Sequence, residues 1–497
     1  MMTEHKEVDV ELWKCFNCEQ YNSKEESCGL YGKKTPANSS CSFFHLRRID
    51  EEKTLPYEPI TSKEYEQKQF RISGAVNLYH DDKIKIAREF YLIQPYFYDK
   101  AGMFWLWNFN NNCWKMVDEY DLMNYLIKGS KETGEITKTK FWIEVMRSLK
   151  LVGRQKEPLP IKSSWIQFNN EIYDLNNGDR IEATPKYFNV NPIPHELRFG
   201  RETPAIDRIF GEWVGEENIK TLKQIIGYCM IPDYPLHRIF CFTGSGLNGK
   251  GVFLRLIQKI IGDNNCSSTE LDLLMSSRFE TGKVYKKLVC QMGETNFNEM
   301  SKTSMLKKLS GQDLVGIEFK NKTPFDYTNY AKLMIATNSL PPTMDKTDGF
   351  YRRWMIIDFP NKFKEGVDVI NMIPEDEYSS LCGQIIDLLP DLLRSGAFFG
   401  EGDVSTRRKR YEQKSNPLFE FIDINYKRDV NSKVPIFEFE DNYNSFLTER
   451  GLRNTTRKRL SLLLRDNGFD IERENVQKED GEWTKWSFIY GLDNKYT

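Results

Sequence analysis

Short apolar runs bounded by polar turns predict buried strands in the middle of the chain. The run 239–242 is followed by a glycine-rich turn and then by a run with helical spacing, 252–261. Two further apolar runs, 287–294 and 332–338, each end in a polar side chain, and a fourth follows the arginines at 352–353. The pattern therefore predicts a multidomain α/β protein in which one strand leads through a glycine loop into a helix.

In residues 61–200, segments with the hydrophobic spacing of helices alternate with segments typical of strands, and this pattern predicts an α+β domain. Runs 83–91 and 138–151 have helical spacing, whereas 103–117 and 165–179 each predict a strand, a turn and a strand. The many aromatic side chains of this region favour a packed core over a surface on which bases stack.

Helical spacing returns further along the chain. The stretch 206–230 is predicted to be helical, as are 301–310 and a lid region at 365–396, and 317–327 predicts a hairpin with a basic tip. The predicted inner face of the first stretch carries Ile219, Leu222, Ile225 and Ile226.

The C-terminal part has the element order of a winged helix. A basic run at 406–411 is predicted on the exposed face of a linker helix. Helices follow at 417–426, 436–450 and 455–467, and a β wing extends to 490. The third helix suits a major groove, because it carries Arg457, Lys458 and Arg459. The alternative is a solvated amphipathic helix in a protein-docking module.

Composition limits the classes of protein and partner. The 497 residues correspond to about three domains. The formal net charge is −2, so any nucleic acid must meet local basic patches rather than a globally basic surface. No stretch of about 18 apolar residues predicts a membrane span, and the N-terminus has no apolar signal region. We therefore expect a cytoplasmic protein with no membrane partner.

The ten cysteines form two groups. Six lie singly in apolar context and predict core thiols of a reducing compartment. The other four have a spacing that suits one tetrahedral Zn²⁺, and a polar segment this short would hardly fold without a metal. The alternative is a set of free or redox-active thiols. The predicted zinc-binding knuckle, residues 1–45, would be a docking or DNA-contact module and has these ligands: Cys15, Cys18, Cys28 and Cys41.

The glycine-rich turn has the spacing of a phosphate-binding loop. Gly244, Gly246 and Gly249 let backbone N–H groups turn inward around an anion, the helix N-terminus adds partial positive charge, and Lys250 adds a full charge. The alternative is a chance glycine turn between strand and helix. The predicted ATP-binding residues are Gly244, Ser245, Gly246, Leu247, Asn248, Gly249, Lys250, Gly251 and Val252. Gly251 and Val252 offer no hydroxyl to Mg²⁺, where Ser or Thr is usual.

Polar side chains at the ends of the later apolar runs supply the remaining chemistry. Glu294 is a candidate to hold Mg²⁺ and polarise water, and Asn338 a candidate to orient that water or contact the γ-phosphate. Arg352 and Arg353 are candidates to reach a neighbouring subunit's γ-phosphate. The alternatives are a capping Glu, a turn-forming Asn and solvent-facing arginines.

Taken together, these motifs resemble those of the D5/P4-type superfamily 3 helicases of viruses and plasmids, which are AAA+-like ring hexamers. Residues 244–251 match the first nucleotide motif, Gly293-Glu294 the acidic motif, and 332–338 with Leu340-Pro341 the following motif. The resemblance implies that Lys250 binds ATP phosphates and that Asn338 is the sensor. It implies that Glu294 assists Mg²⁺ and water, and that Arg353, or secondarily Arg352, is the arginine finger. It also places Lys320 and Lys322 on a hairpin that contacts the DNA backbone.

The sequence therefore predicts an ATP-dependent replicative DNA helicase of a virus, plasmid or integrated element. Its predicted domains are the zinc knuckle, a D5-like N-terminal α+β domain (61–200), an AAA+-like ATPase domain (201–396) and a winged helix (410–497). Expected partners are single- and double-stranded DNA, further copies of the chain in a ring, and a separate primase, because the residues before the D5-like region are too few for a primase domain. Alternatives are a remodelling or packaging ATPase, and an origin-binding initiator that uses ATP mainly as a switch.

Overall fold

The chain divides into two compact units, Met1–Thr61 and Ser62–Thr497, and each is described by itself. The computed structural model describes residues 21–22, 27–28, 33–34, 81–128, 139–169, 171–244, 246–293, 300, 302–320, 322–366, 368–449, 454–477 and 482–495. In the first unit three short strands pair antiparallel in the order β1 (Tyr21–Asn22), β2 (Ser27–Cys28) and β3 (Lys33–Lys34). Cys15, Cys18 and Cys41 lie outside the described residues, as does the side chain of Cys28. The zinc knuckle therefore stays a prediction.

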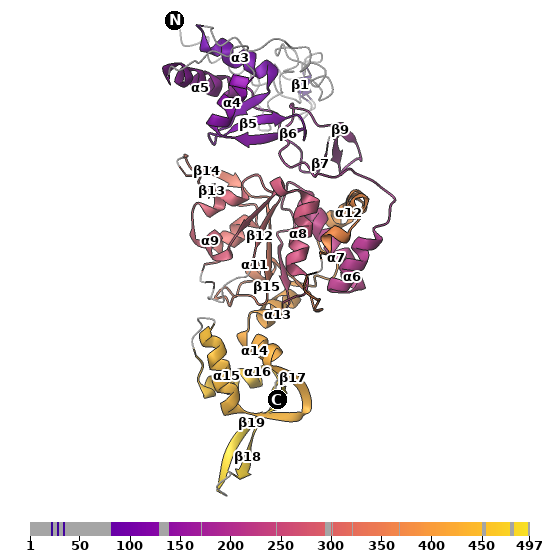
Figure 1. The fold of residues 1–497 in the computed structure, drawn as a ribbon, viewed down its shortest axis with the longest axis vertical. Coiled ribbons are helices and arrows are strands. Elements are labelled where there is room, and N and C mark those ends of the chain that lie inside the picture. Colours follow the sequence, from indigo (N-terminus) through magenta and orange to yellow (C-terminus); the bar gives the residue numbers. More distant parts are fainter. Residues whose placement is uncertain are drawn as a thin grey trace. The chain divides into compact units, whose positions relative to one another are not determined.

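The second unit is built around a parallel five-stranded sheet (Figure 1). Its strands, in spatial order, are β11 (Cys266–Thr269), β12 (Val289–Met292), β15 (Lys332–Thr337), β10 (Ile239–Thr243) and β16 (Trp354–Asp358). Every residue of β10 and β15 is buried. This explains why both strands are continuous apolar runs, since strands of a parallel sheet are covered on both faces.

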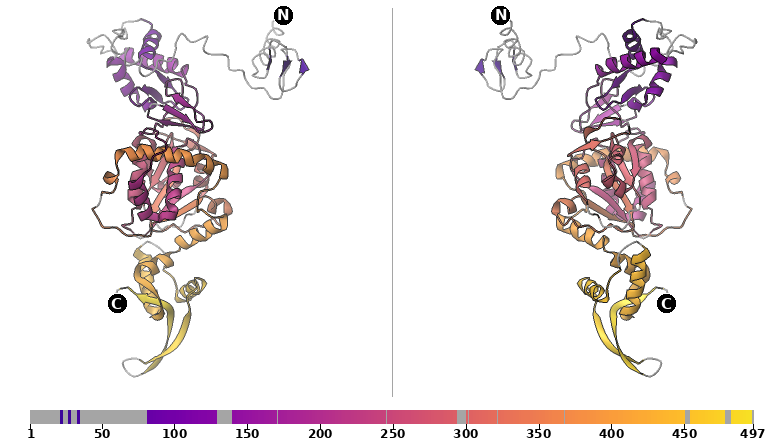
Figure 2. Two further views of the ribbon diagram at one scale, coloured as in Figure 1. Left: turned by 90° about the vertical axis from the view of Figure 1, so that its right-hand side faces the viewer. Right: turned by 90° about the vertical axis from the view of Figure 1, so that its left-hand side faces the viewer.

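Successive side chains of the sheet enter two different cores. Phe240, Phe242 and Met334 pack with the helices on one face, and Ile239 and Cys241 with the helices on the other. Figure 2 shows the helices that cover the sheet. The first core is completed by α6 (Pro204–Val214), α7 (Ile219–Met230), α8 (Lys250–Ile261) and α12 (Glu375–Ser395). The second is completed by α9 (Leu271–Ser276), α10 (Ser304–Leu309) and α11 (Asp348–Tyr351).

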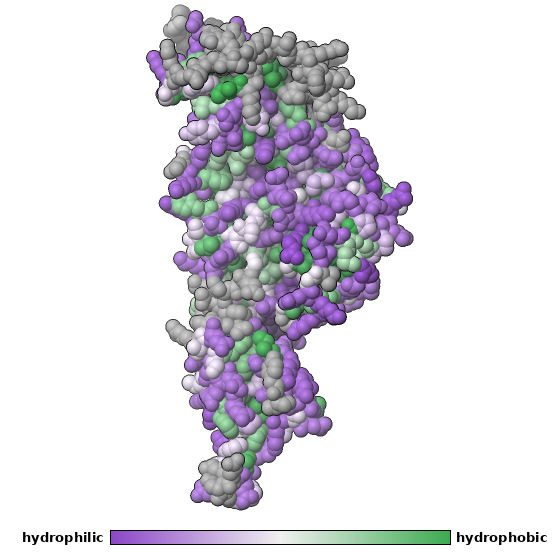
Figure 3. All heavy atoms as spheres, in the orientation of Figure 1, coloured by the Kyte–Doolittle hydropathy of each residue, from purple (hydrophilic) through white to green (hydrophobic). Residues whose placement is uncertain are grey.

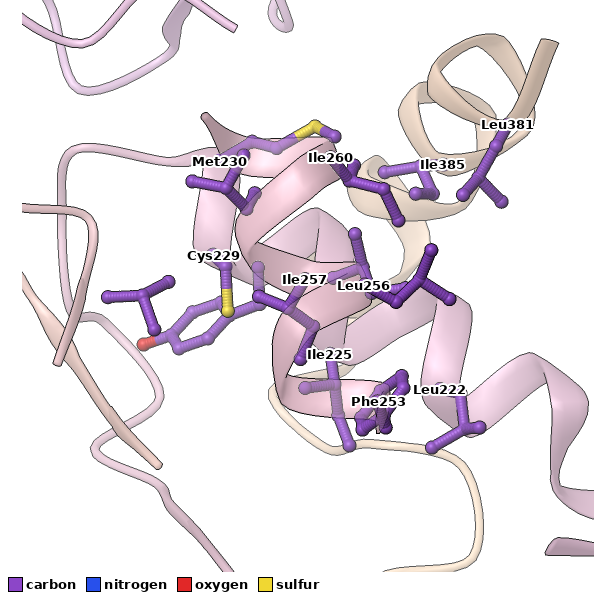
Figure 4. Packing of buried hydrophobic residues seen from close by; sticks show 14 of the residues in the cluster. Leu222, Ile225, Cys229, Met230, Phe253, Leu256, Ile257, Ile260, Leu381 and Ile385 are labelled. Atoms are coloured by element: carbon purple, nitrogen blue, oxygen red, sulfur yellow. The ribbon is translucent and has the colours of Figure 1, made fainter. Parts of the chain in front are cut away.

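Helices α7, α8 and α12 interlock closely. Figure 4 shows Leu222 and Ile225 of α7 beside Phe253 and Leu256 of α8, with side chains of α12 closing the cluster. A Cβ added to Gly227 of α7 would lie 2.5 Å from Ile385 of α12, so a larger residue there would force these helices apart.

The predicted helical stretch 206–230 is wrong in one respect, because it forms two helices. Gly215 adopts φ 85°, which ends α6, and a short 3-10 turn, Glu216–Asn218, separates it from α7. The predicted inner face is otherwise correct, since Leu222, Ile225 and Ile226 are fully buried.

Residues 81–200 contain the predicted mixture of helices and antiparallel strands. The elements are α3 (Lys83–Ile93), β4 (Tyr96–Tyr98), β5 (Phe104–Asn108), β6 (Cys113–Val117), α4 (Glu119–Lys128), α5 (Thr139–Arg154), β7 (Trp165–Phe168), β8 (Glu171–Asp174) and β9 (Arg180–Glu182). They form two three-stranded antiparallel sheets, β4-β5-β6 and β7-β8-β9. Trp105, Trp107, Trp114 and Trp165 are buried, which confirms that these aromatics are core residues.

The cysteines predicted as core thiols are unpaired, and all but the half-buried Cys266 are buried. Burial raises the pKa of Cys113 and of Cys290 to about 11, so both stay protonated at neutral pH. Their role is packing.

A linker helix, α13 (Val404–Lys414), carries the basic run. The run is only partly on an exposed face, because Arg407 is buried and its Nη1 lies 2.8 Å from the Glu401 carboxylate, which also accepts from Arg238. The prediction that the basic run lies on an exposed face is therefore wrong for Arg407.

The C-terminal residues form the three predicted helices and the wing, together with a strand that the sequence did not predict. The elements are α14 (Pro417–Asn425), β17 (Tyr426–Pro435), α15 (Ile436–Glu449), α16 (Arg457–Asp466), β18 (Ile471–Gln477) and β19 (Trp483–Asn494). The sheet order is β17-β19-β18, and the helices pack on it around Phe421, Phe439 and Leu460.

On the face drawn in Figure 3 hydrophilic residues predominate, with apolar ones scattered among them. No helix in the described part of the chain is long and apolar enough to cross a membrane.

Candidate nucleotide-binding site

The loop between β10 and α8 has a backbone that only glycine adopts easily at two positions. Gly246 and Gly249 have φ angles of 93° and 89°. A Cβ added to Gly249 would also lie 2.5 Å from Nε1 of Trp213, so this glycine is required for space as well as for conformation. Ser245 lies outside the described residues.

The loop is held in place by the segment that follows β16. Asn248 Nδ2 donates to the carbonyl of Phe359 (3.2 Å), and the N–H of Phe363 donates to the carbonyl of Leu247 (2.7 Å). A Cβ added to Gly244 would lie 1.9 Å from Asn248 Nδ2. The turn is therefore tightly fitted at both of its ends.

Lys250, the first residue of α8, points back over the loop. Its Nζ donates to the carbonyl of Gly244 (2.6 Å), to Asn248 Oδ1 (3.0 Å) and to Asn338 Oδ1 (3.1 Å). The side chain is only 7% exposed. Phosphate oxygens are the partners that a loop lysine takes when a nucleotide is bound, and they could replace these three oxygens without moving the helix.

Asn338 reaches this point because β15 and β10 are parallel neighbours. Thr243 is the register partner of Thr337, so the residues that follow them, Gly244 and Asn338, emerge together at the carboxyl edge of the sheet. Ligands of open α/β sheets bind at this edge. The structure thus brings Asn338 to the loop and to Lys250, although Lys250 and Asn338 are almost 90 residues apart in the sequence.

Glu294, the predicted acidic residue of the nucleotide site, is not among the residues that the structure describes. β12 ends at Met292, whose register partner is Ile335 of β15, and Glu294 lies outside the described residues. Gly251 is confirmed to offer no hydroxyl, and a Cβ added there would meet nothing within 4 Å. The described residues fit ATP phosphates, because the ammonium of Lys250 lies over the glycine loop.

Asp358, at the carboxyl end of β16, was not singled out from the sequence. Its Oδ1 accepts from Thr243 Oγ1 (2.7 Å) and lies 2.7 Å from Lys414 Nζ. Burial raises the pKa of Asp358, but these two hydrogen bonds, together with the charges of Lys414 and Arg410, outweigh burial and hold the pKa below its ordinary value. The carboxylate therefore ties the last residue before the loop to α13. Its position could have been noticed in the sequence, because it is an acidic residue at the end of an apolar run.

The paired arginines lie at the opposite edge of the sheet, before β16, and they have different environments. Arg353 is buried, with Nε donating to Ser310 Oγ (3.1 Å), Nη2 to the carbonyl of Lys307 (3.3 Å) and Nη1 to the carbonyl of Gly349. Burial, and next the charge of Arg352, lower its pKa. The side chain of Arg352 is exposed.

The predicted hairpin is confirmed. β13 (Leu314–Ile317) pairs antiparallel with β14 (Phe325–Thr328), and Lys320 and Lys322 lie exposed in the connection. Lys322 Nζ donates to the carbonyl of Gly102 (3.0 Å), so this lysine is attached to the turn between β4 and β5.

The basic side chains of α16 also differ from one another. Arg457 Nε donates to Glu440 Oε2 (2.6 Å), which lies on α15. Lys458 and Arg459 are exposed at the start of the helix, after its N-cap Thr456.

Comparisons with known proteins give limited matches. Residues 242–353, which extend from β10 to Arg353, match the model of a family described as "Family of unknown function (DUF5906)". Over 213 residues the chain is 24% identical to a protein of Acanthamoeba polyphaga mimivirus named "Putative helicase". That match covers 40% of this chain and 22% of the relative, so it spans less than a quarter of the mimivirus protein.

Two solved structures of the C-terminal region of NrS-1 are also similar. One is 13% identical with a TM-score of 0.40, covering 80% of this chain and 96% of that one. The other is 14% identical with a TM-score of 0.41, covering 83% and 100%. TM-scores this low do not assign a fold. The description of the fold of this chain rests instead on its own parallel sheet and phosphate loop. The chain thus carries a DUF5906 match and is distantly similar to a helicase-like protein.

Proposed function

We propose that the chain is an ATP-dependent DNA helicase that works as a ring of identical subunits. The observation that carries the proposal is the meeting of Lys250 and Asn338 at the carboxyl edge of a parallel sheet. A lysine that binds the β- and γ-phosphates and an amide that senses the γ-phosphate are what nucleotide hydrolysis requires there. Glu294 would hold Mg²⁺ and polarise the attacking water, and the metal would supply positive charge for the phosphates.

The arrangement of the arginines favours a site shared between subunits. Both lie at the edge of the sheet opposite Lys250, so neither can reach the nucleotide of its own chain. We revise the order of the two candidates. Arg353 is buried among acceptors of its own subunit, and exposed Arg352 is the better finger for a neighbour's γ-phosphate.

DNA would be contacted at two places. Lys320 is exposed on the hairpin connection and suits a phosphate, whereas Lys322 would have to leave the carbonyl of Gly102. Lys458 and Arg459 on α16 suit a duplex, with Arg457 oriented by Glu440. The predicted domain boundaries, the zinc knuckle with its cysteines and a separate primase remain part of this proposal.

A strand-displacement assay tests the helicase activity. The full chain, with ATP and Mg²⁺, is expected to release a labelled strand from a forked duplex, and Lys250→Ala is expected not to. ATP turnover without strand release would identify a remodelling or packaging ATPase instead.

The second candidate function is an initiator that uses ATP as a switch. Gly251 favours it, because without a hydroxyl the site lacks one usual Mg²⁺ ligand. ATP binding without turnover would support this candidate and exclude the helicase.

A further inference from the structure

A cleft of about 880 Å³ lies at the edge of the sheet opposite the phosphate loop. It is bounded by β5 and β6 on one side and by the second half of α8 with the turn before β12 on the other. None of the residues proposed above to bind ATP or DNA lines it.

The cleft is strongly cationic in a chain whose formal net charge is −2. Among the described residues that line it there is a single carboxylate, Asp263, which already accepts from Gln258 Nε2 (3.0 Å). The positive side chains come from three separate elements of the fold and are Lys115, Arg255, Lys259, Lys286 and Lys287. Such a local excess of positive charge marks a site for an anion.

Most of this charge is not neutralised within the described residues. Lys115 and Arg255 are exposed and make no ion pair with another described residue. Lys259 Nζ lies 3.1 Å from Glu375, whose side chain is 72% exposed and therefore a weak competitor. Lys287 Nζ donates to the carbonyl of Asn264 and forms no ion pair with another described residue.

Lys286, which also lines the cleft, is held in an unusual backbone conformation. Its φ is 55°, in the left-handed region that a lysine seldom adopts, and its Nζ lies 5.0 Å from the ring centre of Phe188. Burial lowers the pKa of Lys286 and of Lys287, and the charge of Asp99 offsets this effect only in part for Lys286. An anion beside them would offset that loss of hydration.

The size and polarity of the cleft favour a single strand. Its volume falls in the range of ~300–1,000 Å³ typical of sites that enclose small ligands, which admits one chain of nucleotides but not a duplex. Trp105 and Trp114 line it but are at most 3% exposed, so they cannot stack on bases. Contacts would go to the phosphodiester backbone, with Asn111 and Asn169 as neutral donors at the rim.

The cleft is connected to the hairpin by shared aromatic residues. Tyr285 lines the cleft and packs on Phe319 and Phe325 of the hairpin at 5.6 and 5.2 Å. The N–H of Lys286 donates to Tyr327 Oη of β14 (3.1 Å). A strand bound here would therefore lie next to the hairpin that carries Lys320.

We propose that this cleft binds the phosphodiester backbone of single-stranded nucleic acid, as a site separate from the hairpin and from α16. The inference rests on the proposed function only in taking nucleic acid as the partner. It does not depend on hydrolysis, because the cleft and Lys250 lie at opposite edges of the sheet.

The test is binding of fluorescein-labelled oligo(dT) to the full chain without nucleotide, measured by anisotropy over a range of salt concentrations. The double variant Lys115→Gln/Arg255→Gln changes two exposed side chains. The matched control Lys140→Gln/Arg208→Gln removes the same charge from exposed helix positions outside the cleft.

The cleft variant is expected to bind about tenfold more weakly than wild type. The slope of log K against log salt should fall by about 1.4, or ~0.7 per lost phosphate contact. The control should stay within about twofold of wild type.

Three results would overturn the proposal. They are equal affinities of the cleft and control variants, absence of oligo(dT) binding by wild type, and displacement by millimolar pyrophosphate but not by NaCl of equal ionic strength. The last would indicate a site for small phosphates.

ATP turnover without DNA, measured on the same samples, separates this inference from the proposed function. Unchanged turnover with unchanged binding in the cleft variant removes the inference alone. Absence of turnover in wild type, together with binding that the cleft variant weakens, removes the ATPase proposal alone.

Discussion

Lys250 Nζ donates to Asn338 Oδ1 over 3.1 Å, and this contact joins the phosphate loop to the end of the neighbouring strand. The Asn338 oxygen is one of three acceptors of this ammonium, so the amide can change partners if phosphate oxygens take their place. Asn338→Ala is expected to lower kcat about 100-fold, the cost of removing one oriented polar group, while the nucleotide Kd changes less than about threefold.

Titration with a fluorescent ATP analogue and single-turnover hydrolysis separate the two effects. Asn338→Asp serves as a comparison, because a carboxylate beside the phosphates should weaken ATP binding by repulsion. Loss of binding in Asn338→Ala with unchanged kcat would contradict the role of a sensor.

Gly251 leaves room for the hydroxyl that is missing at this position. A Cβ at this position meets nothing within 4 Å. Gly251→Thr is therefore expected to fold and to lower the Mg²⁺ concentration for half-maximal turnover by about tenfold, the effect of ~1.4 kcal/mol from one added ligand. Gly251→Ala is the matched control, since it adds the Cβ without the oxygen. Identical Mg²⁺ curves for the two variants would show that the metal does not approach residue 251.

Arg352 and Arg353 should respond differently to removal. Arg352→Ala is expected to lower turnover by ~10³-fold with an unchanged melting temperature, because an exposed finger acts only on a neighbour's transition state. Arg353→Ala should instead destabilise the protein by about 2–4 kcal/mol, since it leaves buried acceptors unpaired. Turnover assays and thermal melts distinguish the two residues. Wild-type turnover in Arg352→Ala would exclude it as the finger.

Lys332 predicts a pH dependence of stability. Its ammonium is fully buried, donates to the carbonyl of Ile231 and lies 5.0 Å from the ring centre of Tyr228. Burial lowers the pKa of Lys332 to about 7, whereas that of an unfolded lysine is about 10.4. Between these values the unfolded chain binds a proton that the folded chain lacks. The free energy of unfolding should therefore rise with pH, by at most ~1.4 kcal/mol per unit, and the contribution should be constant below pH 7.

Melting temperatures at pH 7, 8 and 9 measure this dependence. Lys332→Met should show a smaller rise than wild type over that interval, since Met fills the space without a titrating group. Equal pH dependence in the two proteins would show that Lys332 does not titrate in this range.

The strands that carry the site could be predicted because their burial is complete. β10 and β15 have no exposed residue, so each is an uninterrupted apolar run in the sequence. β17 was missed for the opposite reason. Most of its residues are polar and half or fully exposed, and it is a strand because β19 pairs with it. The break at Gly215 was also missed, since one glycine inside a helical pattern does not by itself predict an end.

The members of the site could be found from the sequence, but their arrangement could not. Glycine spacing identifies the loop, and a polar residue after an apolar run identifies Asn338. Only the sheet order, with β15 directly beside β10, brings Asn338 to Lys250. Likewise, two adjacent arginines give no sign of which one faces inward. The order of the two candidates for the arginine finger could therefore be revised only because the structure shows that Arg353 is buried.

The central claim is that this loop hydrolyses ATP in response to DNA. ATP hydrolysis by the full chain with and without single-stranded DNA, wild type beside Lys250→Ala, tests it most directly. We expect turnover that DNA stimulates and that is lost in the variant, because Lys250 carries the only full charge that the described loop residues present to the phosphates. Wild-type protein that binds ATP without turning it over would contradict the claim and would make the chain an ATP-dependent switch.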